Sequence, residues 1–152
     1  MKAKDILIIA GCLSATIAIL HVIVIFVGAP AYRYFGAGED MARQAEAGSI
    51  LPAAITTVIT AVFVIFALYA FGAARLIATP PLLRTGLVTI GVIYTLRGLV
   101  LAHQLPALLS NAPGVAPKDL VFSAVSLATG IAYLLGTWLS WRDLPHRRWR
   151  VA

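Results

Sequence analysis

The stretch that decides the fold is VTIGVIYTLRGLVL, residues 88–101. Apart from Arg97 it is uncharged and mostly apolar, which is typical of a membrane-spanning helix. An arginine near the centre of such a helix costs about 2.5–3.5 kcal/mol on insertion scales, so its surroundings have to compensate for the charge. Arg97 therefore marks a polar centre that the rest of the chain must accommodate.

The composition of the whole chain agrees with a membrane protein. Of the 152 residues, 61% are hydrophobic and 12% are charged, whereas soluble domains carry about a quarter charged residues. This length has room for four spans of about 20 residues each, with short loops. We therefore predict an all-α integral membrane protein, with a single transmembrane domain over residues 1–152 that forms an antiparallel four-helix transmembrane bundle.

Four apolar runs define the expected spans. They cover about 6–27, 52–71, 82–103 and 120–141. The Gly-Ala-Pro sequence at residues 28–30 is expected to end the first span, because proline cannot continue a helix. Residues 106–117 are expected to form a proline-containing loop between the last two spans.

A short surface helix is expected at about 39–47, between the first two spans. Glu39 and Arg43 are four residues apart, which places them side by side on a helix. Gly48 suits the C′ position that follows a helix end. We expect this helix to lie over the outward mouth of the bundle.

The distribution of basic residues predicts the orientation, because lysine and arginine collect on the cytoplasmic side of a membrane. One side of the spans carries eight of them: Lys2, Lys4, Arg75, Arg84, Arg142, Arg147, Arg148 and Arg150. The other side carries Arg33, Arg43 and Lys118. Both termini are therefore expected in the cytoplasm, in a multi-pass protein of the cell membrane, with the bacterial inner membrane as the expected location.

The same distribution explains the net charge of +6. Basic residues at the ends of apolar runs indicate contact with anionic lipid head groups rather than with nucleic acid. Membrane lipid is thus the expected partner, nucleic acid is not, and an oligomer or a partner membrane subunit is compatible with the sequence. The single cysteine, Cys12, excludes an internal disulfide and a thiolate metal cluster.

Helical geometry around Arg97 selects the first candidate ligand-binding residues. At about 100° per residue, Tyr94, Arg97 and Gln104 share one side of the helix, whereas His103 lies on the opposite side. With a helical rise of about 1.5 Å per residue, His21 in the first span and Arg97 in the third are expected at about the same depth in the membrane. His21 is therefore included in the candidate site.

The guanidinium of Arg97 needs a partner that the spans do not supply. The chain has six acidic residues, and all of them lie outside the four apolar runs. The partner must then be a loop carboxylate, backbone carbonyls or an anionic ligand. Glu39 is the preferred carboxylate, because Gly36 and Gly38 allow its loop to fold back toward the bundle.

Several functions remain open from the sequence. The preferred hypothesis is an outward-facing polar site that binds, transports or assists with an anionic lipid or a small ligand. A membrane-embedded enzyme acting on a lipid head group would need a general acid or base, for which His21 and Glu39 are the candidates. A small b-type haem protein would need His21 and His103 as axial ligands. A purely structural or accessory subunit is the last alternative.

Among these hypotheses, the sequence favours those without enzymatic activity. The sequence contains none of the motifs of nucleophilic, metal-dependent or nucleotide-dependent catalysis. It accordingly identifies no catalytic residue, no metal ligands and no cofactor.

Overall fold

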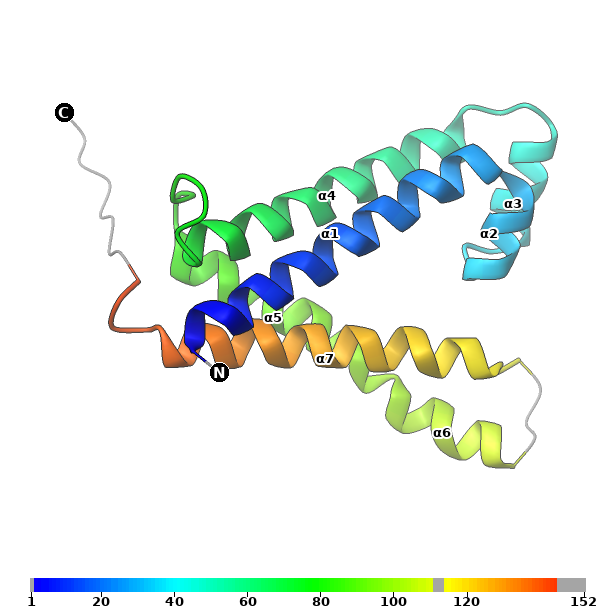
Figure 1. Ribbon diagram of the computed structural model, residues 1–152. Helices are drawn as coiled ribbons and strands as arrows, with labels where there is room; N and C mark the ends of the chain where they lie inside the picture. The colour runs from blue at the N-terminus through cyan, green and yellow to red at the C-terminus, as the bar shows by residue number, and fades with distance from the viewer. Residues whose placement is uncertain (1, 111–113, 145–152) are drawn as a thin grey trace. The chain divides into compact units, whose positions relative to one another are not determined.

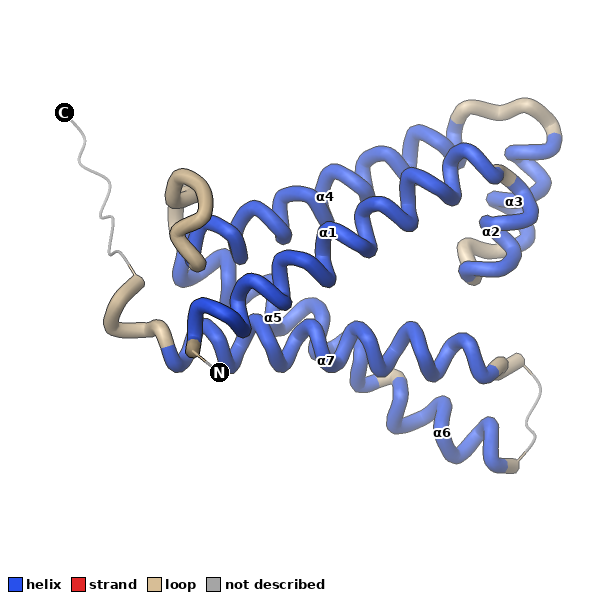
Figure 2. Tube along the Cα trace, in the orientation of Figure 1, coloured by secondary structure: helices blue, strands red, loops and turns tan. Residues whose placement is uncertain are grey.

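Apolar runs in this chain become helices because only a helix satisfies its own backbone hydrogen bonds inside a bilayer. The computed structural model of the protein describes residues 2–110 and 114–144, and these contain helices and connections but no strand, as Figure 2 shows. The helices (Figure 1) are α1 (Ala3–Val27), α2 (Ala29–Phe35), α3 (Glu39–Glu46), α4 (Leu51–Ala73), α5 (Leu83–Leu99), α6 (Leu101–Leu109) and α7 (Pro117–Leu139).

Four helical segments of the described residues are long and apolar enough to cross a membrane. They are Ala3–Val27, Leu51–Ala73, Leu83–Leu109 and Pro117–Leu139. The prediction of an all-α protein is therefore confirmed for the described residues, which contain four candidate membrane spans. The antiparallel order of all four spans and the cytoplasmic position of both termini stay predictions.

The chain falls into two compact units. Unit 1 comprises Met1–Gly11 and Leu68–Ala152, and unit 2 comprises Cys12–Ala67. Helices α1 and α4 each begin in one unit and end in the other. Whether the chain behaves as a single transmembrane domain stays a prediction.

Within unit 1, α5 and α7 pack closely because glycines lie where the two helices meet. A Cβ atom at Gly98 would lie 2.5 Å from the Cα of Leu127, and one at Gly130 would lie 2.6 Å from the backbone nitrogen of Thr95. Gly98 meets Leu127, and the earlier residue Thr95 meets the later residue Gly130. The two helices are therefore antiparallel. Such close backbone approach is how small residues hold membrane helices together.

Two arginines hold the turn that follows α7. Arg75 donates a hydrogen bond to the carbonyl of Asp143 at 3.2 Å, and Arg84 donates one to the carbonyl of Leu144 at 2.7 Å. The Arg84 guanidinium also lies 4.9 Å from the ring centre of Trp141. Cations at this position complement the negative end of the helix dipole.

Within unit 2, α2 and α3 form a helical hairpin whose small core contains Val24, Ala29, Ala31, Tyr32 and Ala42. The buried hydroxyl of Tyr32 is hydrogen-bonded to the hydroxyl of Thr56 in α4 at 3.3 Å. The short helix predicted at 39–47 is confirmed as Glu39–Glu46, and Gly48 follows it with a positive φ of 75°.

The prediction that the helix ends at residues 28–30 was incomplete, because a second helix, α2, starts there. Gly28 has a φ of 74°, which ends α1, and Pro30 then occupies the first turn of α2. Proline suits the first turn of a helix because its fixed φ matches and its missing N–H is not needed there. Residues 29–35 are therefore helical.

The predicted loop over 106–117 was placed too early at its start, and the span predicted to end at about 103 continues to Leu109. The helix is interrupted at Val100, whose carbonyl accepts bonds from the nitrogens of both His103 and Gln104 at 3.0 Å. It then continues as α6 through Pro106 to Leu109. Pro106 removes a single backbone hydrogen bond, a loss that membrane helices tolerate.

Some predictions concern residues outside the described part of the chain. These are Pro113 in the last loop and the basic tail residues Arg147, Arg148 and Arg150.

Candidate functional site

A chain of polar side chains links three helices of unit 1. Arg97 of α5 donates from Nη1 to the Oγ of Ser123 in α7 at 3.0 Å. Ser123 in turn donates to the Oε1 of Gln104 in α6 at 2.6 Å. The structure thus brings together two of the residues selected from the sequence, through a serine that was not selected.

The hydroxyl of Ser123 determines what this chain of side chains offers to a ligand. Ser123 is completely buried, and a hydroxyl has one proton to donate. Because that proton goes to Gln104, the oxygen of Ser123 can only accept in its hydrogen bond with Arg97. The remaining polar atoms at both ends are N–H donors: those of the guanidinium and those of the Gln104 amide. A cation flanked by further donors is complementary to an anion.

The described residues do not enclose the side chain of Arg97. The residue is exposed, and its hydrogen-bond partner within residues 2–11, 68–110 and 114–144 of unit 1 is the hydroxyl of Ser123. Carboxylates of this unit act elsewhere: Asp5 accepts from the nitrogen of Lys2, and Asp119 accepts from the nitrogen of Ala116 at the start of α7. Within the described residues of unit 1, Arg97 therefore contacts a hydroxyl and forms no ion pair with a carboxylate.

Tyr94 lies on the buried side of α5, but it does not extend the polar chain. It is 3% exposed, and its ring stacks on that of Tyr133 in α7 with centres 5.9 Å apart and planes at 18°. This stack lies about one helical turn along α5 from Arg97. Tyr94 therefore supports the α5–α7 contact that holds Arg97 beside Ser123.

The other two candidate residues belong to unit 2. His21 donates from Nδ1 to the carbonyl of Ile17 at 2.8 Å, and its ring lies 4.9 Å from that of Phe63. Glu39 belongs to the α2–α3 hairpin. Their grouping with Arg97 stays a prediction, and so do the enzyme and haem hypotheses, which depend on these residues or on His103.

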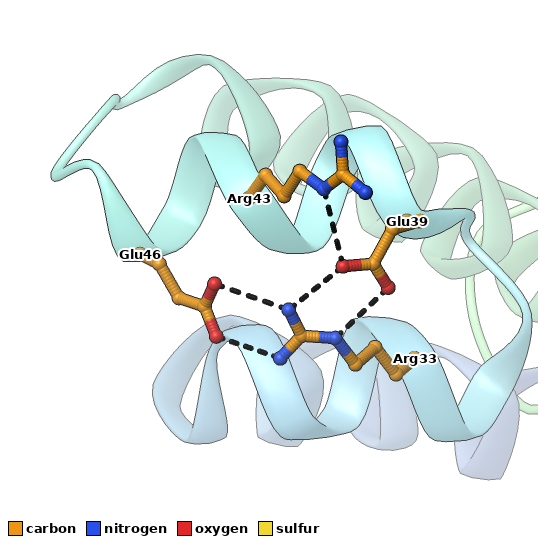
Figure 3. A network of polar contacts seen from close by, with 4 residues as sticks. All are labelled: Arg33, Glu39, Arg43 and Glu46. Carbon is orange, nitrogen blue, oxygen red and sulfur yellow. Dashed lines mark hydrogen bonds and ion pairs between the residues drawn. The ribbon is translucent and has the colours of Figure 1, made fainter.

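Glu39 takes part in a compact ionic network of four side chains, shown in Figure 3. Arg33 binds Glu39 through Nε at 3.0 Å and Nη2 at 2.9 Å, and it binds Glu46 through Nη1 at 2.7 Å and Nη2 at 3.0 Å. Arg43 also donates to Glu39, at 3.4 Å, which confirms the predicted pair four residues apart. Arg33 thus joins α2 to both ends of α3.

The network shifts the ionisation of its members. Hydrogen bonds from Arg33 hold the pKa of Glu39 and the pKa of Glu46 below the usual carboxyl range. Hydrogen bonds to Glu39 and then to Glu46 raise the pKa of Arg33. The ion pairs of Arg33 were not predicted from the sequence because they require helix α2. Glu39 and Glu46 are seven residues apart, so they were recognisable as one side of a helix.

Comparisons of this chain with protein-family models, with curated proteins and with solved structures find no significant match.

Proposed function

We propose that this multi-pass membrane protein binds the anionic group of a lipid or of a small ligand at Arg97 and Gln104. The observation that carries the proposal is the direction of the Ser123 hydrogen bonds, which leaves N–H donors at both ends of the polar chain. A phosphate or carboxylate could accept from the guanidinium and from the amide together. Ser123 would then serve to hold the two donors in position.

The place of Arg97 along its helix also supports a binding role. Arg97 lies twelve residues before the end of the apolar segment Leu83–Leu109, which corresponds to about 18 Å of helix. An arginine that anchors a span in the head groups lies close to the helix end. A charge this far from both ends has to be compensated locally, and an anionic ligand compensates it more fully than one hydroxyl does.

The first experiment tests binding through ligand-dependent stability. The purified protein is reconstituted in phosphatidylcholine nanodiscs, and its unfolding temperature is measured with added phosphatidylglycerol or with inorganic phosphate. We expect one of these anions to raise the unfolding temperature, since a ligand at 100 times its dissociation constant adds about 2.7 kcal/mol to the stability of the folded state. A response to the lipid alone identifies a head-group site, and a response to phosphate identifies a small-anion site.

Variants of Arg97 separate a binding role from a structural one. Arg97→Leu should abolish the anion response while the anion-free protein is as stable as before or more stable, because a costly charge has gone. Arg97→Lys should weaken the response, because an ammonium lacks the planar fork that grips two oxygens. Arg43→Leu is the matched control, which removes the same charge from a 71% exposed side chain outside the spans and should keep the response.

The proposal is overturned if neither anion changes the unfolding temperature. It is equally overturned if Arg97→Leu keeps the anion response, or if this variant loses stability without any anion response in the unmodified protein. The last result would make Arg97 a structural link to α7.

A further inference from the structure

The α2–α3 hairpin is tied closely to the ends of two candidate membrane spans. Gly28 alone separates α1 from α2, and residues 47–50 separate α3 from α4. The neighbouring span ends expose apolar side chains, with Phe26 85% exposed and Ile50 82% exposed. In a membrane protein such side chains are covered by lipid, so the hairpin starts and ends beside lipid.

Packing determines which side of α2 is buried. Tyr32 is 2% exposed and is bonded to Thr56, so it fixes the rotation of α2 about its axis. Tyr34 and Phe35 therefore lie on other sides of the helix, where they are 56% and 38% exposed. Their rings contact each other edge to face, with centres 5.1 Å apart. The result is an exposed aromatic pair at the end of α2, the short helix that follows the first candidate span.

The charges next to this pair are matched among themselves. Arg33 precedes Tyr34, and four hydrogen bonds join its guanidinium to Glu39 and Glu46. Charged groups that already satisfy one another lose less on moving from water into the polar boundary of a bilayer than isolated charges do. The hairpin can therefore approach the boundary with its aromatic pair, although α2 contains an arginine.

We propose that the α2–α3 hairpin lies in the membrane interface, with Tyr34 and Phe35 inserted at the boundary between lipid head groups and acyl chains. Tyr34 favours this depth because its apolar ring carries a polar hydroxyl, and the wholly apolar ring of Phe35 packs against it on the acyl-chain side. Asp40 of α3, which is exposed and lies opposite the buried Ala42, stays in water. The bilayer that surrounds the spans is the partner of this surface, and the proposal is independent of the anion site at Arg97.

Site-directed spin labelling tests the proposal, and the chain suits it because Cys12 is the single cysteine. A Cys12→Ala background receives Tyr34→Cys, Phe35→Cys or, as the control, Asp40→Cys. Each nitroxide-labelled protein is studied in phosphatidylcholine–phosphatidylglycerol nanodiscs, after circular dichroism has confirmed its helix content. Collision rates are measured with oxygen, which concentrates in lipid, and with a water-soluble nickel chelate.

We expect the ratio of oxygen to nickel collisions to be several-fold higher at positions 34 and 35 than at position 40. Equal ratios at all three positions, with strong nickel collisions, would place the aromatic pair in water and overturn the proposal. Weak collisions with both reagents at 34 and 35 would show a protein-covered surface and overturn it as well. The two labelled positions are independent, so a folding defect in one leaves the other to decide the outcome.

Discussion

Single residues set how closely α5 and α7 approach, and Gly98 gives a direct test. Its missing side chain lets the helix lie against the backbone of Leu127. We expect Gly98→Ala to lower the free energy of unfolding by about 1–3 kcal/mol, the usual cost of overpacking, because backbone atoms cannot move aside as a side-chain end can. Leu99→Ala, at a 53% exposed position next to it, is the control and should cost clearly less.

The measurement is an unfolding titration of each variant in the same detergent. If Gly98→Ala unfolds at the same denaturant concentration as the unmodified protein, then α5 and α7 do not meet at this glycine. The same residues hold Arg97 beside Ser123, so a loss of this contact is also expected to weaken the anion response proposed above.

At the scale of elements, the α2–α3 hairpin is predicted to loosen in acid. The pKa values of Glu39 and Glu46 are lowered by Arg33, so their ion pairs contribute stability above the ordinary carboxyl pKa of about 4.5. This contribution is lost as the pH falls below 4.5 and the carboxylates are protonated in the folded state. Both side chains are about half exposed, so solvent screening keeps the effect small.

Amide hydrogen exchange, expressed as protection factors, measures this change at residues 29–46. We expect protection there to decrease as the pH falls from 6 to 3, a range that includes the ordinary carboxyl pKa of about 4.5. Protection in α5 and α7 should stay constant over the same range. In the double variant Glu39→Gln with Glu46→Gln, protection should be low throughout and independent of pH. A pH-dependent loss that persists in the double variant would show that another group is responsible.

At the scale of the whole molecule, the eight-to-three distribution of basic residues predicts where the loops lie. Reporter fusions at Gly48 and at Pro113 should be read as external, and a fusion at Thr79 as internal. Pro113 lies outside the described residues, so that fusion tests the sequence alone. An external signal at Thr79 would contradict the predicted orientation and place both termini outside the cytoplasm.

The sequence by itself determined the features that depend on local composition. The all-helical architecture and the four candidate spans follow from apolar length, and the surface helix follows from the spacing of Glu39, Arg43 and Gly48. Helical periodicity also placed Arg97 and Gln104 on one side, and both bond to the hydroxyl of Ser123. These properties are readable because each one depends on residues within a few turns of a single helix.

The tertiary structure alone decided which polar groups meet. Ser123 lies 26 residues from Arg97, and its role depends on the antiparallel packing of α7 against α5 at Gly98 and Gly130. Arg33 reaches Glu46 only because α2 forms after Gly28. A hydrogen bond between distant side chains depends on the rotation and approach of two helices, which arise from the packing of many side chains at once.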